Sequence, residues 1–140
     1  MGFCFMGKNK AAAEIWFARA KDHLNFAKAG WKESKIISDT CVLCQQAAEK
    51  ALKSLLELEN IDVDKTPSLK THRLTEIVEE CQKYFPQVEE FKHGCDRLTV
   101  YYFDRYPSDV PLNLTKEDAE FALRIAGEIL SVIENILSSV

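Results

Sequence analysis

The stretch that decides the fold is a run of eight good helix-forming residues: Gln45-Gln46-Ala47-Ala48-Glu49-Lys50-Ala51-Leu52. Apolar side chains recur through and around it at steps of three and four residues, and together they make one stripe: Ile37, Cys41, Cys44, Ala48, Leu52, Leu55 and Leu58. This spacing is typical of an amphipathic helix. We therefore predict a helix from about Glu33 to Leu58 whose stripe faces a core.

The same spacing recurs in four other segments, and each predicts a further helix. The segments cover about Lys10–Ala29, Thr71–Tyr84, Gln87–Asp104 and the stretch from Thr115 to the C-terminus. Gly30 offers the first helix a left-handed stop, and Pro86 separates the two middle helices. Thr115 and Asp118 have the spacing of a capping box, in which each side chain bonds an exposed backbone N–H at a helix start.

No segment alternates with the two-residue period of a strand. Helices with one apolar face each, joined by short loops, pack as an antiparallel bundle. The expected fold is all-α: an up-and-down antiparallel four-helix bundle with an additional short helix over about Thr71–Tyr84. The 140 residues are enough for one domain with one core, in which residues 1–9 form a loosely ordered N-terminal segment.

Composition and charge exclude several classes of function. The formal net charge of -4 argues against broad nucleic-acid binding, which depends on clustered Lys and Arg. No apolar stretch reaches the roughly 18 residues that a membrane helix needs. The apolar start, Met1 to Gly7, is too short for a signal peptide. We expect a cytoplasmic protein without a membrane contact.

The cysteines favour core packing over metal binding. Cys41 and Cys44 share one helix face, but a zinc site needs two further ligands, and neither Cys81 nor Cys95 has a close second partner. The pair also lies about two turns inside its helix, away from the helix N-terminus that would lower a thiol pKa. We expect buried, reduced thiols, with no metal and no cofactor.

Three motifs resemble the HEPN family, named for higher eukaryotes and prokaryotes nucleotide-binding. They are the run from Cys44 to Lys53, the segment Thr71-His72-Arg73-Leu74 and the tripeptide Arg105-Tyr106-Pro107. Arg73 departs from the family's usual Thr-His-Asp-Leu. The resemblance spans about Ala12 to Leu137. It implies a helical bundle that is often dimeric and frequently encoded beside a small nucleotidyltransferase.

Some proteins of this family are ribonucleases of toxin–antitoxin systems, and others are noncatalytic partners or nucleotide binders. The ribonucleases carry an Arg followed, after four to six residues, by a His near the last helices. No His follows Arg97, Arg105 or Arg124 in this chain. We therefore expect no catalytic residues, and a binding module that is the partner or regulator of a small nucleotidyltransferase. The alternatives are a degenerate ribonuclease, in which Arg105 and Tyr106 act without His, and a structural helical adaptor.

The expected nucleotide- or partner-binding site centres on Arg105. Its planar guanidinium suits a phosphate, and Tyr106 can stack on a base. The alternative is that Arg105 caps the carbonyls at the end of the fourth helix while Tyr106 packs the turn. The full set of candidate site residues is Arg105, Tyr106, Tyr102, Lys50, Lys53, Glu49 and His72.

Each of the other candidates also has a structural interpretation. Glu49 and Lys53 have the spacing of an ion pair on a solvated helix face, and with Lys50 they could instead form the rim of a pocket opposite Arg105. His72 is either a ligand-binding group or a first-turn residue that bonds backbone groups. The aromatic side chains near Arg97 (Tyr101, Tyr102, Phe103 and Tyr106) suit base stacking or a dimer interface. We favour an interface, shared with the apolar N-terminal segment, in a symmetric homodimer.

Overall fold

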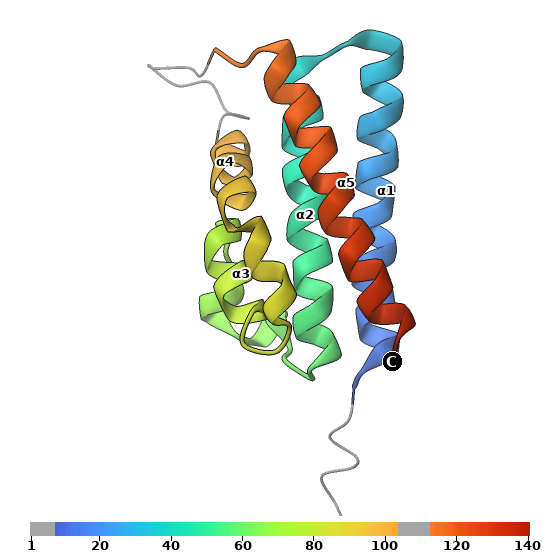
Figure 1. Cartoon of the computed structure of the whole chain (residues 1–140), viewed down its shortest axis with the longest axis vertical. Coiled ribbons are helices and arrows are strands. Elements are labelled where there is room, and N and C mark those ends of the chain that lie inside the picture. The colour runs from blue at the N-terminus through green and yellow to red at the C-terminus, as the bar shows by residue number, and fades with distance from the viewer. Residues whose placement is uncertain (1–7, 104–112) are drawn as a thin grey trace, which may run out of the picture.

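Three long helices frame the molecule: α1 (Lys10–Ser34), α2 (Ile37–Leu58) and α5 (Lys116–Ser138). The computed structural model describes residues 8–103 and 113–140. α4 (Lys92–Phe103) completes the bundle, and the short α3 (Leu74–Cys81) packs against α2 and α4. Consecutive bundle helices run in opposite directions, as the colour order shows (Figure 1). The all-α prediction is confirmed, and no strand occurs in either described range.

α2 is the central helix of the bundle. It contacts α1, α3, α4 and α5, so neighbours cover it on most sides. Six of the seven residues of its predicted apolar stripe are fully buried, while Ile37, at the start of the helix, is half-buried. Polar residues of α2 are buried as well: Thr40, Gln45, Glu49, Lys53 and Ser54. A helix enclosed in this way has little room for a solvated face.

The end of α1 differs from the prediction. Gly30 lies inside the helix, which continues to Ser34, and the left-handed residue is Lys35, with φ 53°. The Lys35 N–H donates to the Trp31 carbonyl at 3.1 Å. Trp31 packs against the core, so the additional turn extends the buried face. α2 therefore begins at Ile37, four residues later than expected.

Both middle helices begin later than expected, and short 3-10 turns lie in the segments before them. Val63–Lys65 and Pro67–Leu69 lie between α2 and α3, and Pro86–Phe91 leads into α4. α3 begins only at Leu74, whose backbone N–H donates to the Thr99 hydroxyl of α4 at 2.9 Å. This cap comes from a distant part of the sequence, and local spacing does not reveal it.

A polar cluster joins α4 to the start of α5. Asp118 accepts hydrogen bonds from the Tyr101 hydroxyl at 2.8 Å, from Arg97 at 3.0 Å and from the Thr115 backbone N–H at 2.8 Å. The predicted Thr115–Asp118 capping box is confirmed. Desolvation raises the pKa of the Asp118 carboxyl, but its hydrogen bonds outweigh that effect and the net pKa is lowered. The cluster therefore links α4 to the N-terminus of α5.

Cys41 and Cys44 are fully buried, which confirms that part of the cysteine prediction. Burial raises the pKa of the Cys44 thiol to about 12, so it stays protonated at neutral pH. The described residues contain no group of three side chains suited to a metal ion. In residues 8–103 and 113–140, no helix is long and apolar enough to span a bilayer.

Gly94 lies where α4 packs tightly against Ile125 of α5. A Cβ at this position would lie 2.6 Å from Cγ1 and 2.9 Å from Cδ1 of Ile125. We predict that Gly94→Ala lowers the free energy of unfolding by about 1–3 kcal/mol, because a buried side chain must move. Urea denaturation followed by circular dichroism measures the change.

Gly127 provides the matched control, because a Cβ there meets nothing within 4 Å. Gly127→Ala should leave stability unchanged or raise it by about 0.4–1 kcal/mol. In an Ile125→Ala background, Gly94→Ala should cost less, since both close atoms are gone. An equal cost in the two backgrounds would show that the contact with Ile125 is not the cause.

Candidate functional site

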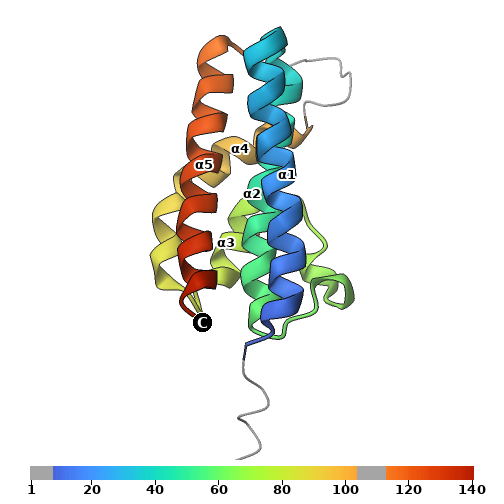
Figure 2. The same cartoon turned by 90° about the vertical axis from the view of Figure 1, so that its right-hand side faces the viewer.

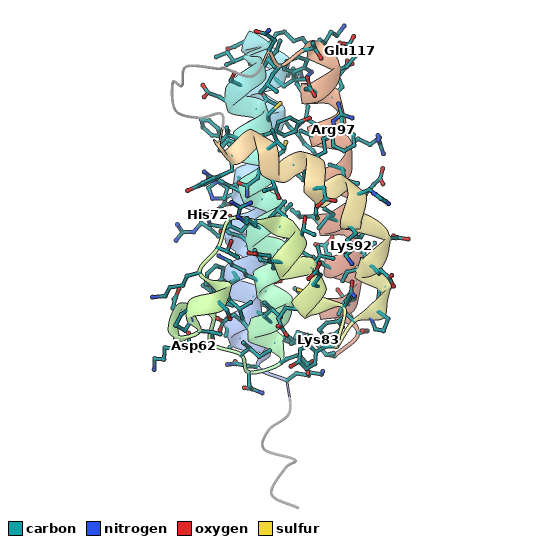
Figure 3. All side chains as sticks on the ribbon, turned by 90° about the vertical axis from the view of Figure 1, so that its left-hand side faces the viewer. Asp62, His72, Lys83, Lys92, Arg97 and Glu117 are labelled. Carbon is teal, nitrogen blue, oxygen red and sulfur yellow. The ribbon has the colours of Figure 1, made fainter. Side chains whose placement is uncertain are left out.

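Five of the seven predicted site residues lie in the described part of the chain: Glu49, Lys50, Lys53, His72 and Tyr102. Arg105 and Tyr106 lie outside the described residues. Figure 3 shows His72 in front of α2, just below the end of α4 that leads toward residue 104. The described candidates come from α2, from the segment before α3 and from α4.

Glu49 and Lys53 are buried, so the prediction of a solvated helix face is wrong. Glu49 is 4% exposed and Lys53 is 6% exposed. The predicted ion pair between them is present, with Lys53 Nζ 2.9 Å from Glu49 Oε2. Lys53 Nζ also lies 6.0 Å from the centre of the Trp16 ring of α1. The pair is thus enclosed between helices, where removal of either charge leaves the other uncompensated.

His72 joins this pair to α4. Its ring Nδ1 lies 2.9 Å from Glu49 Oε1. The ring stacks on Tyr102, with centroids 4.0 Å apart and an interplanar angle of 17°. His72 precedes α3, and its side chain bonds a carboxylate, so the prediction of a first-turn residue that bonds backbone groups is wrong. About half of its side chain is exposed, which leaves it accessible to a ligand.

Gln45 belongs to the same network and was not predicted. It is fully buried, and its Nε2 donates to the His72 carbonyl at 3.0 Å and to Glu49 Oε1 at 3.3 Å. Its Oε1 has no hydrogen-bond partner among the described residues. Gln45, Glu49 and Lys53 follow one another at four-residue steps, so a polar row beside the apolar stripe was the available signal.

Opposing effects set the charge of Glu49. Burial raises the pKa of its carboxyl. The charge of Lys53 and the hydrogen bonds from His72 and Lys53 act in the other direction and outweigh burial, so the net pKa lies below its ordinary value. Glu49 is therefore ionised at neutral pH, and it orients the His72 ring through Nδ1. This arrangement leaves Nε2 as the ring nitrogen that Glu49 does not use.

Lys50 lies on a different surface from His72. It is half-buried and lines a shallow pocket of about 200 Å³ together with Ile15, Trp16 and Arg19 of α1. Burial lowers the pKa of its ammonium group, Glu49 opposes this, and Lys53 and Arg19 add to it. The predicted set is therefore divided between the His72 network and a pocket beside α1.

The aromatic residues of α4 have separate roles. Tyr101 is buried and donates to Asp118, so it is not available as a stacking platform. Tyr102 stacks on His72. Arg97 bonds Asp118 and lies 4.0 Å from the Phe121 ring centre, so a carboxylate already engages its charge. The Phe103 side chain lies outside the described part of the structure.

Comparison with known families gives a match to the HEPN domain over residues 13–136. The chain belongs to the HEPN family. A comparison with curated proteins finds no significant match. Two solved structures share the fold of this HEPN chain. TT1696 from Thermus thermophilus has a TM-score of 0.75 and 26% identity, over 88% of this chain and 96% of that one. ST0689, an archaeal HEPN homologue, has a TM-score of 0.68 and 24% identity, over 89% and 97% respectively.

We predict that Glu49→Gln destabilises this HEPN domain by about 3–5 kcal/mol, because Lys53 is left buried without a carboxylate. Urea denaturation at neutral pH tests this. The loss should shrink in acid: the lowered pKa of Glu49 means that its stabilisation is present above the unfolded pKa of about 4.3 and disappears as pH falls through the folded pKa.

Two further variants separate the buried pair from ordinary surface charge. Glu128 pairs with Arg124 on the exposed side of α5, so Glu128→Gln should change stability by about 1 kcal/mol or less. Adding Lys53→Met to Glu49→Gln should recover part of the loss, because no charge then remains unpaired in the core. A full loss in the double variant would show that the hydrogen bonds to His72 and Gln45 dominate.

Proposed function

We propose that this HEPN chain is a noncatalytic binding module, that its ligand is a nucleotide held at His72 and Tyr102, and that it regulates a small nucleotidyltransferase as that enzyme's partner. The observation that carries the proposal is the stack of the His72 ring on Tyr102 at the surface. The His72 ring bonds to Glu49, which is buried and paired with Lys53. Arg105 follows Tyr102 by three residues in the sequence.

The stack suits recognition because its geometry is fixed before a ligand arrives. Two aromatic rings at 4.0 Å are already ordered, and Glu49 sets the orientation of the His72 ring. A preorganised site loses less conformational entropy when it binds. An aromatic ring offers a base a stacking surface, and an Arg offers its phosphate a planar set of donors.

RNA cleavage is a second candidate, and one observation favours it. The sequence has no His after Arg105, but the fold brings His72 against Tyr102 with a carboxylate on its Nδ1. A histidine oriented in this way is the usual acceptor of a hydroxyl proton. Against this candidate, Lys53 and Arg97 are each engaged by a carboxylate, so neither is an uncompensated charge for a reacting phosphate.

We predict that Arg105→Ala and His72→Ala each weaken nucleotide binding by about 1–3 kcal/mol, or about 5–150-fold in Kd, because each removes a charged or polar contact to the ligand. Calorimetric titration of ATP, GTP and their diphosphates into wild type and variants measures the change. Arg124→Ala and His93→Ala are the matched controls, since both residues are exposed and Arg124 contacts its helix neighbours Glu128 and Phe121. Unchanged binding in Arg105→Ala or His72→Ala would remove that residue from the site.

We also predict that the metal-free protein does not cleave RNA. Incubation with a fluorescently labelled RNA, followed by gel analysis, tests this. Cleavage that persists through purification and disappears in His72→Gln would establish the ribonuclease instead. Co-expression with the proteins encoded in the neighbouring reading frames tests the partner role, and failure of a nucleotidyltransferase to co-purify would count against it.

A further inference from the structure

The outer face of α1 carries the two most exposed large apolar side chains of the described structure. Ile15 is 71% exposed and Phe26 is 70% exposed. They lie eleven residues apart, which is about three helical turns, so both point to the same side. In Figure 2 α1 lies in front of α2, so one side of α1 is turned away from the bundle. The buried row of α1 is a different set: Ala13, Phe17, Ala20, Leu24 and Ala27.

The outer face has the spacing of a coiled-coil seam. Its residues follow one another at alternating steps of three and four: Ala12, Ile15, Arg19, Asp22, Phe26 and Ala29. All six are exposed or half-buried. Residues at such steps form the narrow stripe by which one helix packs against another. α1 therefore has two packing faces, of which only one is used inside the bundle.

The seam is also symmetric about its own midpoint, between Ala20 and Lys21. Arg19 and Asp22 lie at equal distances on opposite sides of this midpoint, and so do Ile15 and Phe26. Ala12 and Ala29 form the outermost pair of the same kind. In an antiparallel helix pair related by a twofold axis, residues at equal distances on opposite sides of the axis meet in one layer. Each layer here would join matched partners: small with small, apolar with apolar and cation with carboxylate.

We infer that this seam is a dimer interface, in which two copies of the chain pack their α1 helices antiparallel about a twofold axis at residues 20 and 21. Ile15 of one copy packs against Phe26 of the other, and Arg19 pairs with Asp22. Arg19 and Asp22 fit this role because neither forms an ion pair within the described part of the chain. The ends of the seam are alanines, which allow close approach of the helices.

This location differs from the interface expected from the sequence, near Tyr101 to Phe103. Tyr101 is buried and bonded to Asp118, so it cannot contact a second copy. Val100 on α4 is exposed, but it is less exposed than Ile15 or Phe26. Internal symmetry in α1 gives no advantage to a partner of unrelated sequence, whereas a second copy packed about a twofold axis uses it in every layer. The seam therefore favours self-association.

The charged layer gives a direct test by light scattering and analytical ultracentrifugation at micromolar concentration and low salt. The wild type should have twice the 16.0 kDa mass of the chain. Arg19→Asp places four carboxylates in the two central layers, and Asp22→Arg places four cations there. Each variant alone should be monomeric, because like charges then face each other. Mixed in equal amounts, the two variants should form a heterodimer, because both central layers are complementary again.

Controls separate this interface from misfolding and from other surfaces. Both substituted residues are exposed, so circular dichroism and the urea midpoint should match the wild type. Val100→Asp should remain a dimer, while Phe26→Asp should become a monomer. A monomeric wild type, a dimer that survives Arg19→Asp and Phe26→Asp, or a mixture of the two charge variants that stays monomeric would each overturn the inference.

Discussion

The buried ion pair between Glu49 and Lys53 is the interaction on which the rest of the site depends. Ion pairs in a protein interior stabilise it little, because the cost of desolvation offsets most of the attraction. What this pair provides is position: Lys53 keeps Glu49 ionised, and ionised Glu49 holds the His72 ring. The ring in turn stacks on Tyr102 of α4. The buried charge of Glu49 in α2 thus orders the stack of His72 on Tyr102 of α4 at the surface.

The central position of α2 makes this arrangement possible. Because four other helices contact α2, its polar residues lie between elements and can bond to several of them at once. Gln45 shows the same principle, since its amide group reaches both Glu49 and the His72 backbone. A polar residue on a peripheral helix would have exchanged those contacts for water.

The helices of this HEPN domain could be predicted from the sequence because their apolar period is local information. The predicted stripe of α2 and the Thr115–Asp118 capping box are both present. Gly30 predicts a helix end because its left-handed preference is local information, whereas the packing of Trp31, which accompanies the extension of α1 past Gly30, is tertiary. Burial of Gln45, Glu49 and Lys53 could not be predicted, since polar character alone suggests solvent. His72 was identified, but its contacts join segments far apart in the chain.

Four buried thiols in the described part of the chain can report on the local motion of the helices that carry them. Cys41 and Cys44 lie in α2, Cys81 in α3 and Cys95 in α4. Burial raises the pKa of Cys44, Cys81 and Cys95, so an alkylating reagent meets a reactive thiolate only after local opening. The rate at which each thiol is labelled therefore measures how often its helix leaves the bundle. The relative stability of the central helix and of the shorter peripheral ones can be followed without substituting any residue.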